Sequence, residues 1–114
     1  MSHYEQRLQK DLDNIRSEVN KLSGWVDEAV NNSVHALLSG NEELASATIL
    51  GDGPINRKMR EIDNLCHQFV AVHLPSGRHL RLISSVIRIN ITLERIGDYA
   101  VTISRELRQG GDEL

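Results

Sequence analysis

Apolar residues recur every three or four positions along most of the chain, with polar and charged residues between them. The first run extends over residues 4–39, and its members are Leu8, Leu12, Ile15, Val19, Leu22, Val26, Ala29 and Ser33. This spacing places a single apolar stripe on a helix. Gly24 lies within the same run, and we interpret it as a close-packing point in a continuous helix rather than as a break.

A second helix is predicted over residues 41–72. Asn41 follows the dipeptide Ser39-Gly40, which ends the first helix, and its side chain suits an N-cap. The segment Gly51-Asp52-Gly53-Pro54 interrupts the pattern. Because proline lacks an N–H donor and clashes with the preceding turn, we expect a kink or a short break there.

The third helix, predicted over residues 78–108, carries two apolar stripes. The first has the spacing of an ordinary core face: Val86, Ile89, Leu93, Ile96, Ala100, Ile103 and Leu107. The second is turned from it by about 100–120° and contains Leu80, Ile83, Ile87, Asn90, Ile91 and Val101. A three-helix bundle covers only one such face. We therefore predict that Leu80, Ile83, Ile87, Ile91 and Val101 form the interface of a symmetric dimer.

Three helices joined by short turns predict an all-α fold, an antiparallel three-helix bundle that residues 1–114 form as a single domain. Hydrophobic residues at 39% and charged residues at 25% are typical of a folded globular protein, and aromatic residues at 4% disfavour a β-sandwich. The formal net charge of −3 disfavours binding to nucleic acid. A single cysteine suits a reducing cytoplasm, and no run approaches the about 18 apolar residues of a membrane span.

Glu94 and Asp98 are the most distinctive polar pair. Spaced i, i+4, they share one helix face in the middle of the second apolar stripe. Two carboxylates so placed could hold a hard cation, or they could pair with Arg95 or with an arginine of another subunit. The spacing alone leaves these alternatives open. The chain has no Walker loop, Rossmann glycine pattern or nucleophile elbow, so no enzyme class is indicated.

The octapeptide of residues 93–100, Leu-Glu-Arg-Ile-Gly-Asp-Tyr-Ala, resembles the signature of the PhoU family, which regulates bacterial phosphate uptake. Other positions agree with the family in spacing: Asp52, Ile55, Asn56, Ile62, Cys66 and the run Leu80-Arg81-Leu82. His79 stands where the family usually has an aspartate, and Asn56 stands where many members complete a second carboxylate pair. The resemblance covers about residues 5–108. It corresponds to one of the two bundle repeats that the family usually carries.

The resemblance implies a three-helix bundle and a metal site of the Glu/Asp-x-x-x-Asp type. By this resemblance, Glu94, Asp98 and Asp52 are candidate ligands for a divalent or ferric ion such as iron or zinc. Gly97 agrees with such a site, because a residue without a Cβ lets a neighbouring helix or a ligand approach closely.

The resemblance also implies a cytoplasmic regulator without catalytic activity, which restrains phosphate signalling. Its expected partners are a phosphate-sensing histidine kinase and the phosphate transport ATPase, besides a second copy of the chain, and it would meet the membrane only through partners. Two alternatives stay open. One is a structural or dimerising module of a transporter or a longer regulator, and the other is a metal-dependent hydrolase that uses Glu94 and Asp98.

Overall fold

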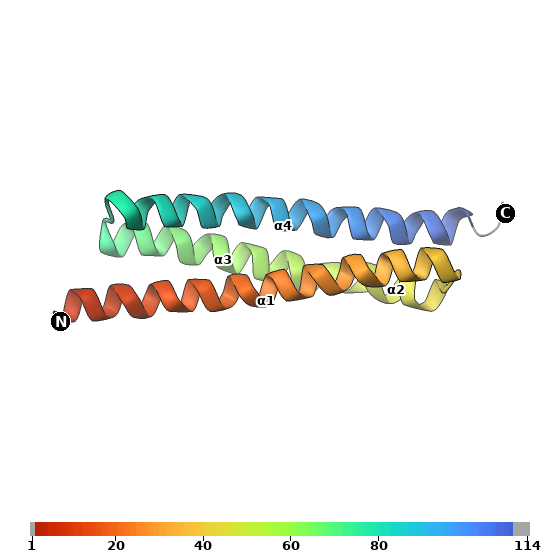
Figure 1. Ribbon diagram of the computed structural model, residues 1–114, viewed down its shortest axis with the longest axis horizontal. Helices are drawn as coiled ribbons and strands as arrows, with labels where there is room; N and C mark the ends of the chain where they lie inside the picture. The colour runs from red at the N-terminus through yellow and green to blue at the C-terminus, as the bar shows by residue number, and fades with distance from the viewer. Residues whose placement is uncertain (1, 111–114) are drawn as a thin grey trace.

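Residues 2–110, which the computed structural model describes, form four helices: α1 (His3–Ser39), α2 (Glu42–Leu50), α3 (Asp52–His73) and α4 (Gly77–Gly110). α2 and α3 follow each other along one side of the molecule, so the four helices form three antiparallel rods (Figure 1). The bundle measures 63 × 18 × 17 Å. The predicted all-α, antiparallel three-helix bundle is therefore confirmed, with its second helix divided in two. None of the described helices is long and apolar enough to cross a bilayer.

The turn between α1 and α2 is fixed by local sequence signals. Gly40 ends α1 in the left-handed conformation, with φ of 71°, which glycine adopts without the steric cost of a Cβ. Asn41 Oδ1 then accepts a hydrogen bond of 3.0 Å from the backbone N–H of Leu44. This bond satisfies one of the free N–H groups at the start of α2 and confirms the predicted N-cap.

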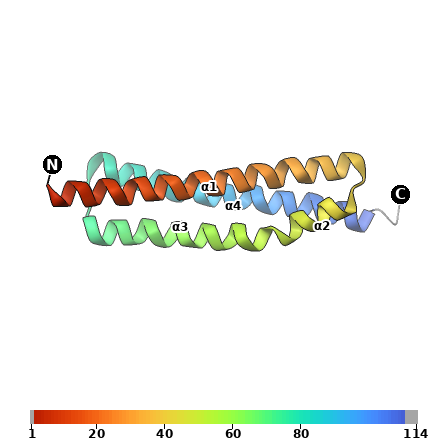
Figure 2. The same cartoon turned by 90° about the horizontal axis from the view of Figure 1, so that it is seen from below.

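The predicted interruption at residues 51–54 is a break between α2 and α3. The N–H of Gly51 closes α2 by donating to the carbonyl of Ala47 at 3.0 Å. Pro54 lies in the first turn of α3, where backbone N–H groups have no partner within the helix and a missing donor costs little. Figure 2 shows α2 and α3 end to end, with a bend between them. Asp52, the first residue after the break, lies close to Gly97 of α4.

The core lies between α1, α3 and α4. The stripe predicted on α1 is confirmed, since Leu8, Leu12, Ile15, Leu22, Val26 and Ser33 are buried and Val19 and Ala29 are partly buried. Cys66 of α3 is fully buried, and its burial raises the pKa of the thiol to about 11. Gly24 lies on the exposed side of α1, and a Cβ there would have no neighbour within 4 Å. The helix is continuous, but the interpretation of Gly24 as a close-packing point is wrong.

α4 differs from the predicted pattern of two separate stripes. Its buried side chains are Ile83, Val86, Asn90, Ala100, Val101 and Ser104, which come from both stripes and from positions between them. Ile89, predicted in the core, is 46% exposed. Ile83 and Val101, predicted in a dimer interface, are only 1% and 7% exposed. α4 thus has one broad core face centred between the predicted stripes, and Ile83 and Val101 are unavailable to a second copy.

Candidate functional site

Asp52, one of the predicted metal ligands, lies against α4. Its Oδ2 accepts a hydrogen bond of 3.1 Å from Asn56 Nδ2, while its Oδ1 is buried without a hydrogen-bond partner. A Cβ placed on Gly97 of α4 would lie 3.9 Å from Asp52 Oδ1 and 3.6 Å from Cγ2 of Ile55. Gly97 therefore faces the Asp52 carboxylate. Both distances are ordinary contacts, so the site has room for a methyl group.

Glu94 and Asp98, the other two predicted ligands, lie on either side of Gly97 along α4. Glu94 is half-buried and Asp98 is exposed. Neither carboxylate forms an ion pair with Arg95 or with any other residue from 2 to 110. In this part of the chain, no three His, Cys, Asp or Glu side chains are grouped so that they could hold a metal ion. One copy of the described chain does not assemble three ligands, and the metal site stays a prediction.

An ion-pair network between α1 and α3 was missed by the sequence analysis. Lys58 Nζ donates to Glu18 Oε2 at 2.6 Å and to Glu61 Oε2 at 3.1 Å, and Lys21 Nζ donates to Glu18 Oε1 at 3.1 Å. The side chains of Glu18 and Lys58 are only 12% and 14% exposed. The Lys58 ammonium also lies 5.6 Å from the centroid of the Trp25 ring, within the range of a cation–π interaction. Glu18 lies between the predicted stripe positions of α1, on the face expected to be solvated, so the pattern did not indicate its burial.

The Glu18–Lys58 network makes the stability of the bundle depend on pH. Hydrogen bonds from Lys58 and Lys21 lower the pKa of Glu18 below its ordinary value of 4.5. Hydrogen bonds to Glu18 and Glu61 raise the pKa of Lys58 above its ordinary value of 10.5. The network stabilises the folded state fully between pH 4.5 and pH 10.5, the ordinary pKa values of the two groups. This stabilisation is lost as the pH falls through the lowered pKa of Glu18 or rises through the raised pKa of Lys58.

Glu18→Gln is accordingly expected to lower Tm at pH 7, and the deficit relative to the unchanged protein should shrink below pH 4.5. Thermal melts followed by circular dichroism across this range measure the difference. Glu5→Gln, at an exposed carboxylate near the start of the same helix, is the matched control and should show a much smaller deficit at pH 7. A deficit for Glu18→Gln that is the same at all pH values would contradict the network's role.

The end of the bundle near the N-terminus is held by His73, the last residue of α3. His73 is 4% exposed, and its Nε2 lies 2.7 Å from Asp11 Oδ2 of α1. The hydroxyl of Tyr4 donates to the backbone carbonyl of His73 at 2.6 Å. The His73 ring also packs against Phe69, with centroids 4.7 Å apart. These contacts join the start of α1 to the end of α3, so His73 has a structural role.

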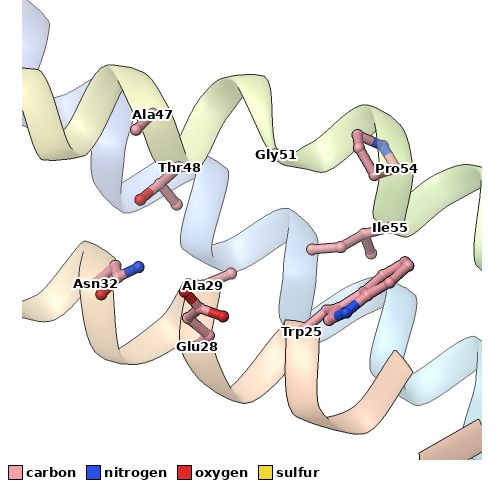
Figure 3. A pocket seen from close by; sticks show the side chains of 9 residues that line it. All are labelled: Trp25, Glu28, Ala29, Asn32, Ala47, Thr48, Gly51, Pro54 and Ile55. Atoms are coloured by element: carbon pink, nitrogen blue, oxygen red, sulfur yellow. The ribbon is translucent and has the colours of Figure 1, made fainter. Parts of the chain in front are cut away.

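A pocket of about 300 Å³ opens between α1 and the α2–α3 break (Figure 3). From α1 it is lined by Trp25, Glu28 and Asn32, and from the opposite side by Thr48, Pro54 and Ile55. Trp25 is the single tryptophan of the chain and is 40% exposed. This pocket was not predictable from the sequence pattern, because its two walls come from segments at least fifteen positions apart.

Sequence similarity relates the chain to known proteins. Residues 19–107 match the family model of the PhoU domain. The chain is 36% identical over 107 residues to the phosphate-specific transport system accessory protein PhoU homolog of Pseudomonas aeruginosa, covering 94% of this chain and 44% of that protein. It is 30% identical over 103 residues to the phosphate-specific transport system accessory protein PhoU of Escherichia coli, covering 90% of this chain and 43% of that protein. The chain thus spans less than half the length of these relatives. No solved structure matches it significantly.

Proposed function

This chain belongs to the PhoU family, and from that premise we propose that it is a cytoplasmic negative regulator of phosphate uptake and phosphate signalling. Its similarity over 94% of its length to an accessory protein of the phosphate-specific transport system carries the proposal. The chain would act by binding other proteins rather than by catalysis. Its proposed partners are a phosphate-sensing histidine kinase and the phosphate transport ATPase, through which it would be held near the membrane.

The regulatory role is tested in cells grown with high and with low phosphate. A tagged form of the chain should co-purify with the histidine kinase or the transport ATPase, to an extent that changes with phosphate. Removal of its gene should raise the expression of a phosphate-starvation reporter in high phosphate. If neither partner is captured and the reporter does not change, the proposal is wrong.

A homodimer is the second part of the proposal, with an interface smaller than the sequence predicted. Leu80 and Ile91 are 42% and 50% exposed on α4, and Ile87 between them is partly buried against the core. Asp98 is exposed on the same flank of the helix. A second copy that places the same flank against it would bury these apolar side chains in a symmetric interface.

Ile91→Glu is expected to convert this dimer into a monomer, because a carboxylate would have to be desolvated in the apolar centre of the interface. Light scattering coupled to gel filtration at micromolar concentration measures the mass. Ile89→Glu is the matched control, since Ile89 is 46% exposed on the opposite flank of α4 and should leave the dimer intact. A monomeric unchanged protein, or equal dissociation of both variants, would refute the proposed interface.

Metal binding by Asp52, Glu94 and Asp98 is proposed as part of the same assembly. The residues fit an ion in one respect, because Asp52 Oδ1 is a buried carboxylate oxygen without a partner. Carboxylate oxygens suit hard or borderline divalent ions and ferric iron. Since residues 2–110 of one copy bring no three ligands together, a second copy would have to complete the set. The ion would then lessen the repulsion between carboxylates of the two copies.

Elemental analysis after gentle purification is expected to find metal in the unchanged protein and little in Glu94→Gln combined with Asp98→Asn. Glu106→Gln, at an exposed position of the same helix, is the control and should retain the metal. A chelator should also shift the mass measured by light scattering toward that of the monomer. Equal metal content in all three proteins would show that the two residues are not ligands.

A further inference from the structure

We propose that the pocket between α1 and the α2–α3 break binds an arginine side chain of a partner protein. Figure 3 shows the indole ring of Trp25 beside Ile55, with Glu28 and Asn32 following it along α1. At about 300 Å³ the pocket is at the lower end of the range for ligand sites. It therefore fits a single side chain presented by a protein surface.

The apolar walls of the pocket suit the methylene part of such a side chain. The small side chains of Ala29 on α1 and Ala47 on α2 line the pocket without filling it. Ile55 of α3 forms its wall beside Trp25. Long basic side chains pack their methylene groups on apolar surface and keep the charged end at a polar rim. Trp25 adds a broad aromatic surface, and tryptophan is the ring that attracts cations most strongly.

The charge around the pocket favours a cation over an anion. Glu28 lines the pocket and forms no ion pair with another residue in the described range 2–110. The Lys58 ammonium near Trp25 is already paired with Glu18 at 2.6 Å and with Glu61 at 3.1 Å. Glu28 is the one charged residue among those that line the pocket, and its carboxylate would repel an anionic ligand.

An arginine matches this arrangement in two ways. Its planar guanidinium can stack on the indole of Trp25 and donate to the carboxylate of Glu28. A lysine ammonium can make the same ion pair but cannot stack. This inference goes beyond the proposed phosphate role, because it concerns the side chain that the pocket accepts and is tested without the phosphate system.

Trp25 provides the readout, because it is the only tryptophan of the chain. Its fluorescence is followed during titration with acetyl-Ala-Ala-Arg-Ala-Ala-amide and with two otherwise identical peptides carrying citrulline or norleucine. The arginine peptide should cause a saturable change at about millimolar concentration. The citrulline peptide, which has nearly the same shape without the charge, should bind about tenfold more weakly. The norleucine peptide, with neither charge nor planar group, should be weaker still.

Two variants that each remove one negative charge distinguish binding in the pocket from general attraction of the peptide to a negatively charged surface. Glu28→Gln should abolish the preference for arginine over citrulline. Asp27→Asn, at the neighbouring exposed carboxylate that does not line the pocket, should retain that preference. Equal binding of arginine and norleucine peptides would assign the pocket to an apolar side chain and overturn the proposal. The absence of any saturable change, or a preference that survives Glu28→Gln, would overturn it as well.

Discussion

Asn90→Asp is expected to destabilise the bundle by about 3–5 kcal/mol at pH 7, because it leaves an uncompensated charge in the core. Asn90 is 2% exposed, and its Nδ2 donates to the backbone carbonyl of Met59 at 2.9 Å. Its Oδ1 has no hydrogen-bond partner. The substitution replaces the donor that faces this carbonyl with a second acceptor, and it adds a negative charge where water cannot solvate it.

The same substitution should also make stability depend on pH. Burial raises the pKa of the introduced carboxyl, so the loss of stability should diminish as the pH falls through that raised value. Asn90→Leu is the control. It removes the unpartnered oxygen together with the donated hydrogen bond and should cost about 1 kcal/mol. Urea unfolding at pH 7 and pH 4.5 measures both variants, and equal losses at pH 7 would show that the position is not desolvated.

Ile83→Ala is expected to lower the free energy of unfolding by about 2–5 kcal/mol, as for other buried isoleucines cut back to alanine. Ile83 is 1% exposed and belongs to the central core cluster. The same change at Ile89, which is 46% exposed, should cost no more than about 0.5 kcal/mol. Urea unfolding of the two variants compares the same substitution, isoleucine to alanine, at a buried and at an exposed position of α4. If Ile89→Ala were the more damaging variant, the core face of α4 would be the one predicted from the aliphatic spacing.

The sequence predicts α1 well because its core positions are filled almost entirely by aliphatic residues. Leu12, Ile15 and Leu22 repeat at helical spacing, and all three are buried. The break before α3 was equally predictable, since the steric effect of Pro54 acts within one turn. Both features depend on interactions local to the chain, for which the sequence contains all the information.

The core face of α4 was not predictable in the same way. Gly97 and Ser104 lie at its centre and are buried, but neither is aliphatic, so the spacing of aliphatic residues shows two stripes in place of one broad face. Asn90 is also buried at this centre, although the pattern assigns it to the second stripe alone. The contact between Glu18 and Lys58 and the pocket at Trp25 depend on how neighbouring helices are rotated about their axes. The separate helical patterns do not contain that information.

α2 has consequences for the dynamics of the molecule because it has only nine residues. An isolated helix needs about 12–15 residues to be marginally stable in water, so α2 depends on its packing against α1 and α4. The break at Gly51 separates it from α3, and its backbone amides should exchange with deuterium before those of the neighbouring helix. Ala47 and Thr48 belong to both α2 and the pocket. Binding of the proposed side chain there should therefore slow this exchange, so that partner binding and local unfolding of α2 are coupled.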